Sequence, residues 1–408
     1  MKILFTRFPL ESAHGGAEVQ TLSLMKGLSE RGHDVAFLGS CPVLLTEVAS
    51  LGLRVTGLEI GPPPVTKWGA VSFLWRKKGM QRRLEKSIMR TSFSAEISVS
   101  GDHGVSADLR DDRHIDAIFM LSMTEKLLLT ETAVKNGIKV FWIEHDRVGP
   151  WLTKNPWLPR LRILSRLVTT ICVSELSRKI YVDLGWRAGD VVAIPNGIDL
   201  VRFDDESFSE PPLPSPLPPG EGDSLFSRNA SSSSLRLGCV ARLSPEKGVD
   251  VLIQAVSGLP DVDLTIIGKG PEEGYLRKQI EQIHGTEMQS VERIRIIPHV
   301  DDLAAFYRSI DALVLPSRDN DPFGLVAAEA MACGTPVIVT EQCGIAGYLS
   351  DGVDAVIAKA NSEKSLREAI LRIKDPTVRS RLSTAGRKTA REKFSVDSMI
   401  ERYCGLLR

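Results

Sequence analysis

Two blocks of the sequence alternate between short apolar runs and stretches with apolar residues at helical spacing, and this alternation constrains the fold most. Residues 2–6 are predicted to form a buried strand, residues 17–31 a helix and residues 34–38 a second strand. A crossover of this length favours parallel strands with helices packed on the sheet. Further strands are expected at residues 115–121, 139–144, 166–173 and 191–195. We therefore expect residues 1–202 to form a Rossmann-like, doubly wound α/β domain.

The alternation stops in a Pro- and Ser-rich segment at residues 203–234. This composition buries too little apolar surface to offset the entropy of ordering, so we interpret the segment as a linker insertion. Residues 94–113 are polar and have no clear period, which is typical of a surface loop. Beyond the linker, strands are expected again at residues 235–241, 263–267, 293–297, 312–316 and 336–339.

A second Rossmann-like domain is thus predicted over residues 235–392, and a helix within residues 393–408 is predicted to pack back on the first domain. The expected fold class is α/β, with two doubly wound parallel sheets that face each other across a cleft. Open parallel sheets bind ligands beyond the carboxyl ends of their strands. Functional residues are therefore expected in the loops that follow strands.

The composition excludes several classes of protein. Lys and Arg number 51 against 51 Asp and Glu, so there is no net charge for broad binding to nucleic acid, and any anion site must be local. The six Cys residues lack the paired spacing of a zinc site or of a disulfide framework. No apolar run matches a secretory signal or reaches the roughly 18 residues of a membrane span, which predicts a cytoplasmic protein.

The most informative segment lies between Pro316 and Gly334. Asp321 lies in the expected loop, and a helix predicted to start near Gly324 carries Glu329. The first amides of such a helix have no internal acceptor and favour phosphate or sugar oxygens. A rise of about 8 to 9 Å would let the two carboxylates bind hydroxyls at the ends of one extended ligand. On spacing alone, the alternative of a helix cap and a solvated side chain stays open.

Three other loops carry residues suited to anions or sugars. Arg242 offers a planar fork of donors and Lys247 a mobile charge, a pairing that suits a diphosphate, although two such cations are more often a solvated face. Gly15 and Gly16 open a helix directly after a strand, where a plain turn is the commoner reason for a glycine pair. His145 ends another strand and faces the expected cleft, although a lone His is more often structural.

Taken together, these segments resemble the group 1 (family 4) retaining glycosyltransferases, which have the GT-B fold. Asp321 and Glu329 are similar to the family's signature of two carboxylates separated by seven residues, with Asp in place of the usual Glu at the first position. The resemblance implies that Asp321 meets the donor sugar, that Glu329 holds the ribose, and that Arg242 and Lys247 bind the diphosphate.

The same resemblance implies roles for residues that chemistry alone does not assign. Catalytic roles fall to Asp321 and to His145, near the donor sugar and the acceptor. Base contacts are implied at His299 and Val300. Further contacts to the diphosphate are implied at Gly15, Gly16, Phe323, Gly324 and Leu325.

The resemblance thus implies an enzyme that moves a sugar from a nucleoside diphosphate sugar to a carbohydrate or lipid-linked acceptor, without a metal ion or a cofactor, in the assembly of envelope polysaccharide or glycan. Two alternatives stay open. One is a sugar-nucleotide isomerase or a glycogen-type enzyme with the same two domains. The other is a catalytically silent protein that binds a nucleotide sugar.

A basic stretch at residues 77–86 lies close to Trp68, Phe73 and Trp75. A solvated helix is the simpler interpretation. The alternative is a peripheral contact with anionic lipid at the inner face of the plasma membrane, made by Lys77, Lys78, Arg82 and Arg83.

Overall fold

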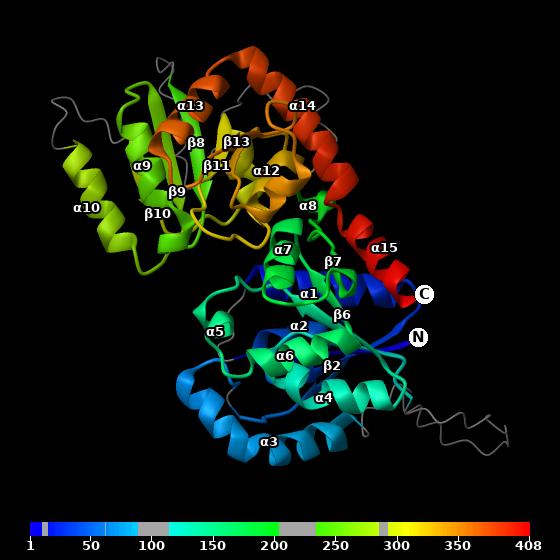
Figure 1. Ribbon diagram of the computed structural model, residues 1–408. Helices are drawn as coiled ribbons and strands as arrows, with labels where there is room; N and C mark the ends of the chain where they lie inside the picture. Colours follow the sequence, from blue (N-terminus) through cyan, green and yellow to red (C-terminus); the bar gives the residue numbers. More distant parts are fainter. Residues whose placement is uncertain (10–14, 62, 89–113, 204–233, 285–292) are drawn as a thin grey trace. The chain divides into compact units, whose positions relative to one another are not determined.

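The structure is a computed structural model that describes residues 1–9, 15–61, 63–88, 114–203, 234–284 and 293–408. These residues form two compact units (Figure 1). The first unit comprises Met1–Val173, Ser177–Ile194 and Ile400–Arg408, and the second comprises Ser174–Leu176 and Pro195–Met399. The predicted loop at 94–113 lies outside the described residues, as does the predicted linker except for its two end residues.

A parallel sheet of seven strands, in the order β3-β2-β1-β4-β5-β6-β7, is the centre of the first unit. The order reverses between β1 and β4, which makes this position the topological switch point of the sheet. The strands are β1 (Lys2–Arg7), β2 (Asp34–Gly39), β3 (Arg54–Gly57), β4 (Ala117–Met120), β5 (Lys139–Glu144), β6 (Thr169–Cys172) and β7 (Val191–Ala193).

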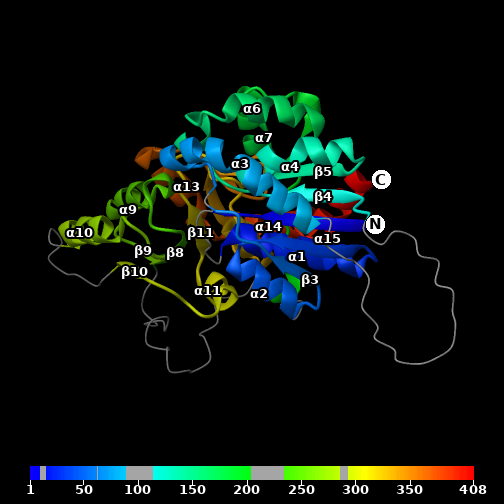
Figure 2. The same cartoon turned by 90° about the horizontal axis from the view of Figure 1, so that it is seen from below.

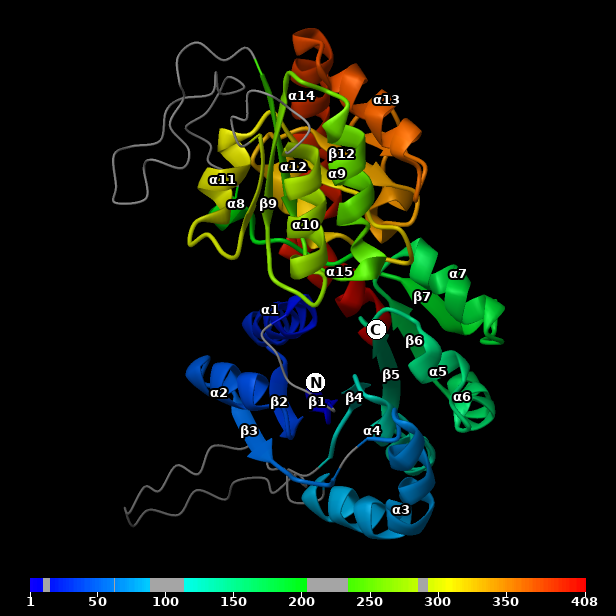
Figure 3. The ribbon, with the colours of Figure 1, turned by 90° about the vertical axis from the view of Figure 1, so that its left-hand side faces the viewer.

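Helices cover both faces of this sheet, as Figures 2 and 3 show. On one face lie α1 (Gly16–Glu30), α2 (Pro42–Ser50) and the end of the C-terminal helix α15 (Val396–Leu407). On the other lie α3 (Lys67–Ile88), α4 (Met123–Lys135) and α6 (Leu158–Leu164). The short helix α5 (Pro150–Thr153) follows β5, and α7 (Glu175–Asp183) follows β6.

The central strands are apolar on both faces because both faces are covered. On the α1 face, Phe119 stacks between Phe5 and Phe141, with ring centroids 4.8 Å apart in each pair. Tyr403 of α15 lies 5.9 Å from the same Phe119 ring, and Ile400 packs against Gly27 of α1. The last helix of the chain therefore completes the core of the first unit.

The second unit contains a parallel sheet of six strands in the order β10-β9-β8-β11-β12-β13. Helices α10 and α13 pack on α9, and helices α8, α11 and α14 pack on α12. The strands are β8 (Leu235–Val240), β9 (Val262–Ile267), β10 (Ile294–Ile297), β11 (Ala312–Leu315), β12 (Val337–Thr340) and β13 (Val356–Ala358). The helices are α8 (Leu200–Phe203), α9 (Val249–Ser257), α10 (Glu273–His284), α11 (Leu303–Ser309), α12 (Leu325–Ala332), α13 (Glu363–Ile373) and α14 (Pro376–Lys393).

Two Rossmann-like parallel sheets confirm the expected fold class. Apart from Ser174–Leu176, the chain enters the second unit at Pro195, before the boundary predicted at residue 202. Two contacts explain this, since Ile198 bridges to Ser395 in parallel and the ring of Phe203 lies 6.3 Å from that of Tyr307. Among the described residues, no helix is both long enough and apolar enough to cross a bilayer.

Candidate functional site

Two loops of the second unit meet through an ion pair between predicted site residues. Lys247 Nζ, in the loop after β8, lies 2.6 Å from Asp321 Oδ2, in the loop after β11. Ser317 Oγ donates a hydrogen bond of 3.0 Å to the same oxygen. The Asp321 backbone is also fixed, because its amide donates to the Gln342 carbonyl and its carbonyl accepts from the Gly344 amide. The carboxylate therefore has a fixed position at the carboxyl end of the sheet.

Backbone geometry explains how the two loops come so close. The turn Pro245–Lys247 ends at Gly248, which has a φ of 65°. A Cβ on Gly248 would lie 2.3 Å from the Pro316 carbonyl oxygen, so only glycine allows this approach. Gly324 has a φ of 99° and caps the start of α12, where the first amides lack acceptors within the helix.

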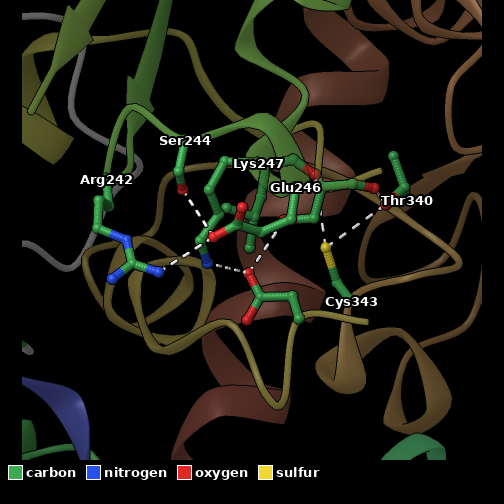
Figure 4. Close-up of polar contacts among 9 residues, drawn as sticks. Arg242, Ser244, Glu246, Lys247, Thr340 and Cys343 are labelled. Carbon is green, nitrogen blue, oxygen red and sulfur yellow. Dashed lines mark hydrogen bonds and ion pairs between the residues drawn. The ribbon is translucent and has the colours of Figure 1, made fainter. Parts of the chain in front are cut away.

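Arg242, Ser244 and Glu246 form a second set of contacts beside this pair (Figure 4). Arg242 donates to Glu246 Oε1 at 3.0 Å, and Ser244 Oγ donates to the same oxygen at 2.7 Å. Partial burial raises the pKa of the Glu246 carboxyl, but hydrogen bonds from Ser244, from the Glu246 amide and from Arg242 outweigh it and hold the pKa below its usual value. Each cation of the cluster thus has one carboxylate partner, and Arg242, 70% exposed, is the more accessible cation.

Cys343 lies beside this cluster and is not a nucleophile. Burial, assisted by the charge of Asp321, raises the pKa of its thiol to about 11, so the thiol stays protonated. Its Sγ donates to the Leu315 carbonyl at 3.5 Å and lies 3.6 Å from Thr340 Oγ1 (Figure 4).

Glu329, on α12, has a different partner. The Tyr307 hydroxyl donates to Glu329 Oε2 at 2.8 Å. Burial raises the pKa of the Glu329 carboxyl, and the hydrogen bond from Tyr307 opposes that rise. The residue keeps some exposure, so part of its surface remains accessible to a ligand.

The remaining residues predicted in this unit fall into two places. The Phe323 side chain is buried against Phe394, with ring centroids 5.5 Å apart, so only its backbone is available to a ligand. His299 is exposed and pairs with Asp301 at 3.3 Å, next to Val300 in the loop after β10. Since β9 and β8 separate β10 from β11, this loop follows a strand about 14 Å from the strand that leads to Asp321.

His145 follows β5 in the first unit. Its two ring nitrogens are buried, and neither has a hydrogen-bond partner among the described residues. Burial, followed by the charges of Arg7 and Lys126, lowers the pKa of the imidazole to about 3, so the ring is neutral at physiological pH. A buried polar group without a partner costs free energy, which favours a functional over a structural role.

Gly15 and Gly16 open α1 as predicted, yet their surroundings are acidic. Gly15 has a φ of −132°, which any residue can adopt, so its backbone does not require glycine. Glu18 lies in the first turn and accepts a hydrogen bond of 2.6 Å from Arg7. A carboxylate already close to the positive end of α1 weakens this end as a site for another anion.

Sequence reasoning missed several partners of the predicted residues. Glu246 lies between Arg242 and Lys247, and Ser317 lies in the segment from Pro316 to Gly334. Nothing in the sequence distinguishes either residue from one with a solvated side chain. Tyr307 gave no signal, because it lies 22 residues from Glu329 on another helix. In the part of the chain that the structure describes, no three His, Cys, Asp or Glu side chains cluster closely enough to hold a metal ion.

Comparison with known proteins identifies the family to which the chain belongs. The family described as "Glycosyl transferase 4-like domain" matches residues 15–197, and that described as "Glycosyl transferases group 1" matches residues 224–389. The chain belongs to the group 1 glycosyltransferases. Each Rossmann-like unit thus corresponds to one of the two domains of the family.

Individual members of the group are similar over different lengths. The phosphatidyl-myo-inositol mannosyltransferase of Mycobacterium leprae (strain TN) is 31% identical over 239 residues, which are 55% of this chain and 55% of that protein. That of Mycolicibacterium smegmatis (strain ATCC 700084 / mc(2)155) is 27% identical over 370 residues, or 88% of this chain and 81% of that protein. The chain spans about half the length of most of the curated relatives that it matches, as with the first.

A solved structure matches the whole chain. The crystal structure of Anabaena Alr3699/HepE in complex with UDP-glucose is similar with a TM-score of 0.73 and 19% identity, covering 100% of this chain and 99% of that chain. At this level of identity the likeness concerns the fold, and it confirms the GT-B architecture of the group 1 glycosyltransferases.

Proposed function

We propose that the protein is a retaining glycosyltransferase that moves a sugar from a nucleoside diphosphate sugar to a hydroxyl of a carbohydrate or lipid-linked acceptor. Family membership supports sugar transfer, and the mannosyltransferases among its relatives support a hexose as the transferred sugar. The complex of the Anabaena protein with UDP-glucose supports a nucleoside diphosphate sugar as donor. The single observation that carries the proposal is the Lys247–Asp321 pair, whose Asp321 lies close in sequence to the start of α12.

The proposed reaction is a substitution at the anomeric carbon. The bond between C1 of the sugar and the diphosphate oxygen breaks, and its electron pair stays on the diphosphate. The acceptor oxygen bonds to C1 on the same face, and its proton moves to the released diphosphate oxygen. The products are a glycoside and a nucleoside diphosphate. Negative charge grows on the leaving group, so fixed positive groups beside it lower the barrier.

Lys247 and Arg242 would stabilise this charge in place of a metal ion. Arg242 is mostly exposed and paired only near the surface, so it can exchange Glu246 for a phosphate at small cost. The first amides of α12, at Gly324 and Leu325, add donors at the positive end of the helix. Secondary contacts to the diphosphate would come from Gly15, Gly16 and the Phe323 backbone.

Asp321 and Glu329 would hold hydroxyl groups of the donor. A carboxylate has about four sites for hydrogen bonds, so Asp321 can accept from a sugar hydroxyl while it holds Lys247 and Ser317. Glu329 is oriented by Tyr307 and would accept from the ribose. His299 and Val300 would contact the base, which fits their loop three strands along the sheet from Asp321.

His145 would position a sugar hydroxyl. An imidazole with a pKa of about 3 binds a proton too weakly to act as a general base at neutral pH. A neutral ring can still accept one hydrogen bond and donate another. The proton of the acceptor therefore goes to the diphosphate in the proposed reaction.

A test of this assignment compares two changes at one contact. Lys247→Met removes a charge at similar length and should lower transfer about 100-fold or more, because one charge-stabilising donor supplies several kcal/mol in the transition state. Asp321→Glu, which restores the usual family residue, should keep transfer. A thermal-shift panel of nucleoside diphosphates identifies the nucleotide that the protein binds. Mass spectrometry then follows hydrolysis of the donor and transfer to the acceptor. The reaction is run with and without EDTA to test whether it needs a metal ion.

The outcomes separate the alternatives. Normal transfer by Lys247→Met would overturn the assignment. Isomerised donor formed without an acceptor would indicate the isomerase, and calorimetric binding without hydrolysis or transfer across an acceptor panel would indicate the silent protein. The anomeric configuration of the product, read by proton NMR, tests retention directly.

A peripheral contact with anionic lipid at the inner face of the plasma membrane is the further partner that we propose. On α3, Trp68 and Trp75 are 86% and 85% exposed, an unusual exposure for tryptophan. Lys78, Arg82, Arg83 and Lys86 are exposed on the same helix, whereas Lys77 is partly buried, with Nζ 5.6 Å from the centre of the Trp157 ring. Co-sedimentation with phosphatidylserine vesicles that is unchanged by Trp68→Ser/Trp75→Ser would remove this contact.

A further inference from the structure

We infer that a pocket in the first unit binds an uncharged sugar ring of the acceptor, an inference that rests on the proposed transfer reaction. The pocket has a volume of about 290 Å³. Its lining includes Phe8, just after β1, Leu121 and Ser122, just after β4, and Glu144, which ends β5. It therefore lies at the carboxyl ends of the strands on either side of the switch point, where doubly wound sheets bind ligands.

The polar part of the lining includes a buried pair of opposite charges. Lys126 Nζ lies 2.8 Å from Glu144 Oε1 and donates to the Ile143 carbonyl at 3.2 Å. The Tyr181 hydroxyl donates to Glu144 Oε2 at 2.8 Å. The side chains of Lys126 and Glu144 are 5% and 9% exposed. A buried pair of this kind contributes little net stability compared with apolar packing, so its presence in a pocket points to ligand recognition.

Among the described residues that line the pocket, each cation already has a carboxylate partner. Arg7, the second lining cation, is paired with Glu18 at 2.6 Å, and both side chains are buried. Asp146, also in the lining, is exposed and adds a negative charge. A phosphate on the bound ring would have to compete with a buried carboxylate for its cation. Hydroxyl groups meet no such obstacle, because they both donate and accept hydrogen bonds.

Aromatic walls complete the pocket. Trp151 is partly exposed, and its indole N–H donates to the Arg147 carbonyl at 2.8 Å, which fixes the ring. Trp186 packs edge-on against Tyr181, with ring centroids 5.2 Å apart. Binding pockets for neutral small molecules combine such apolar walls with a few placed polar groups. The C–H faces of a sugar ring can lie on the indole rings while its hydroxyls reach Lys126, Glu144 and Tyr181.

Intrinsic fluorescence tests this inference without a donor. All six tryptophans lie in the first unit, and three of them, Trp142, Trp151 and Trp186, line the pocket. Methyl glucoside, methyl galactoside and methyl mannoside are titrated into the full chain, in parallel with glucose 6-phosphate and inositol 1-phosphate. At least one neutral glycoside should change the emission saturably, and the phosphorylated probes should bind about tenfold more weakly or not at all.

Two variants locate the binding. Trp151→Ala should weaken the binding of that glycoside about tenfold, because stacking on an aromatic ring is lost, and Trp151→Phe should restore most of it. Trp68→Ala, on an exposed face outside the pocket, is the matched control and should leave binding unchanged.

Several results would overturn the inference. These are tighter binding of a phosphorylated probe, no response to any glycoside, an unchanged affinity in Trp151→Ala, and an affinity that rises with the alkyl chain from methyl to octyl whichever sugar is attached. The last result would assign the pocket to a lipid tail. The measurement does not involve Lys247, so a failure here is distinct from failure of the transfer proposal.

Discussion

The two units hold their ion pairs at different depths. In the second unit, Asp321 is buried but its partner Lys247 is 22% exposed, and Arg242 lies largely in solvent. In the first unit, the Lys126–Glu144 and Arg7–Glu18 pairs are buried on both sides. Both units thus pair Lys or Arg with Asp or Glu near the carboxyl ends of a parallel sheet, and the pairs differ in how far the cation is buried.

This difference in depth separates two kinds of chemistry. Arg242, which lies near solvent and is paired with a partly exposed Glu246, can exchange this carboxylate for a phosphate with little loss of free energy. A buried cation cannot, because its abandoned carboxylate would remain desolvated and unpaired. We therefore expect anionic ligands to bind the second unit and neutral hydroxyl compounds to bind the first.

The largest effect should come from breaking the buried pair. Lys126→Met leaves Glu144 buried with Tyr181 as its partner and without a cation, so we expect the first unit to lose about 3–5 kcal/mol of its free energy of unfolding. Urea unfolding followed by tryptophan fluorescence measures this unit selectively, because all six tryptophans belong to it. Lys78→Met, at an exposed position of α3, is the matched control and should not move the midpoint. Equal midpoints for wild type and Lys126→Met would contradict the contrast.

His145 should make the first unit sensitive to acid. Its pKa in the folded state is about 3, below the ordinary 6.5, so the unfolded chain binds the proton more tightly. The stability that this His contributes is fully present above pH 6.5 and is lost as the pH falls from 6.5 toward 3. His145→Phe should therefore reduce the difference between urea midpoints at pH 7 and pH 4.5.

An NMR titration checks the same point without unfolding. In protein labelled at histidine Cε1, the signal absent from His145→Phe should not shift between pH 5 and pH 8, because burial holds the pKa of this imidazole at about 3. A His145 signal with a midpoint near 6.5 would show that the ring is not held neutral by burial.

Glu125 should act in the opposite direction and with a smaller effect. Burial raises the pKa of its carboxyl to about 7, against hydrogen bonds from the Ser122 and Leu121 amides. The folded state therefore holds the proton more tightly, and the stabilisation present below pH 4.5 is lost as the pH rises through 7. Glu125→Gln keeps an acceptor for both amides and removes the charge.

The matched measurement is the urea midpoint at pH 5 and at pH 8. Glu125→Gln should raise the urea midpoint of the first unit more at pH 8 than at pH 5. The corresponding gain in the free energy of unfolding should be larger at pH 8 by roughly 1–2 kcal/mol. A variant that is equally stabilised or equally destabilised at both pH values would show that Glu125 is ionised throughout.

The sequence predicted the central strands and the helices at residues 17–31, near Gly324 and within residues 393–408 because each signal is local. Buried parallel strands are short apolar runs, and the helices between them carry apolar residues at helical spacing. Two strands that escaped prediction lack these signals. β3 is an edge strand with alternating partial burial, and β13 has only three residues. The second unit starts at Pro195 because of contacts with Ser395 and Tyr307, which no local pattern reveals.

The candidate site divides in the same way. Arg242, Lys247, Asp321 and Glu329 could be selected because each lies within a motif that is continuous in sequence. Their partners could not, since Lys247 and Asp321 are 74 residues apart in the chain and their contact depends on the order of the strands. Lys126 and Tyr181 look like ordinary residues of amphipathic helices until the fold brings both to Glu144.

The smallest predicted effect concerns Tyr307, whose hydroxyl holds Glu329. Tyr307→Phe keeps the buried ring and removes only the donor, so the pKa of Glu329, already raised by burial, should rise further. We expect nucleoside diphosphate binding, measured by calorimetry at pH 7.5, to weaken about two- to fivefold. The loss should grow as the pH falls, because Glu329 becomes protonated at a higher pH and accepts fewer hydrogen bonds from the ribose.

The pH dependence distinguishes this role from a packing effect. Glu329→Gln, which cannot ionise, should bind weakly at every pH and show no change when Tyr307→Phe is added. If Tyr307→Phe instead weakens binding equally from pH 5.5 to pH 8, the hydroxyl does not act through the charge of Glu329. The Glu329 carboxylate is more deeply buried than that of Glu246 beside Arg242. In that case its burial would have no effect on the affinity for the nucleotide donor.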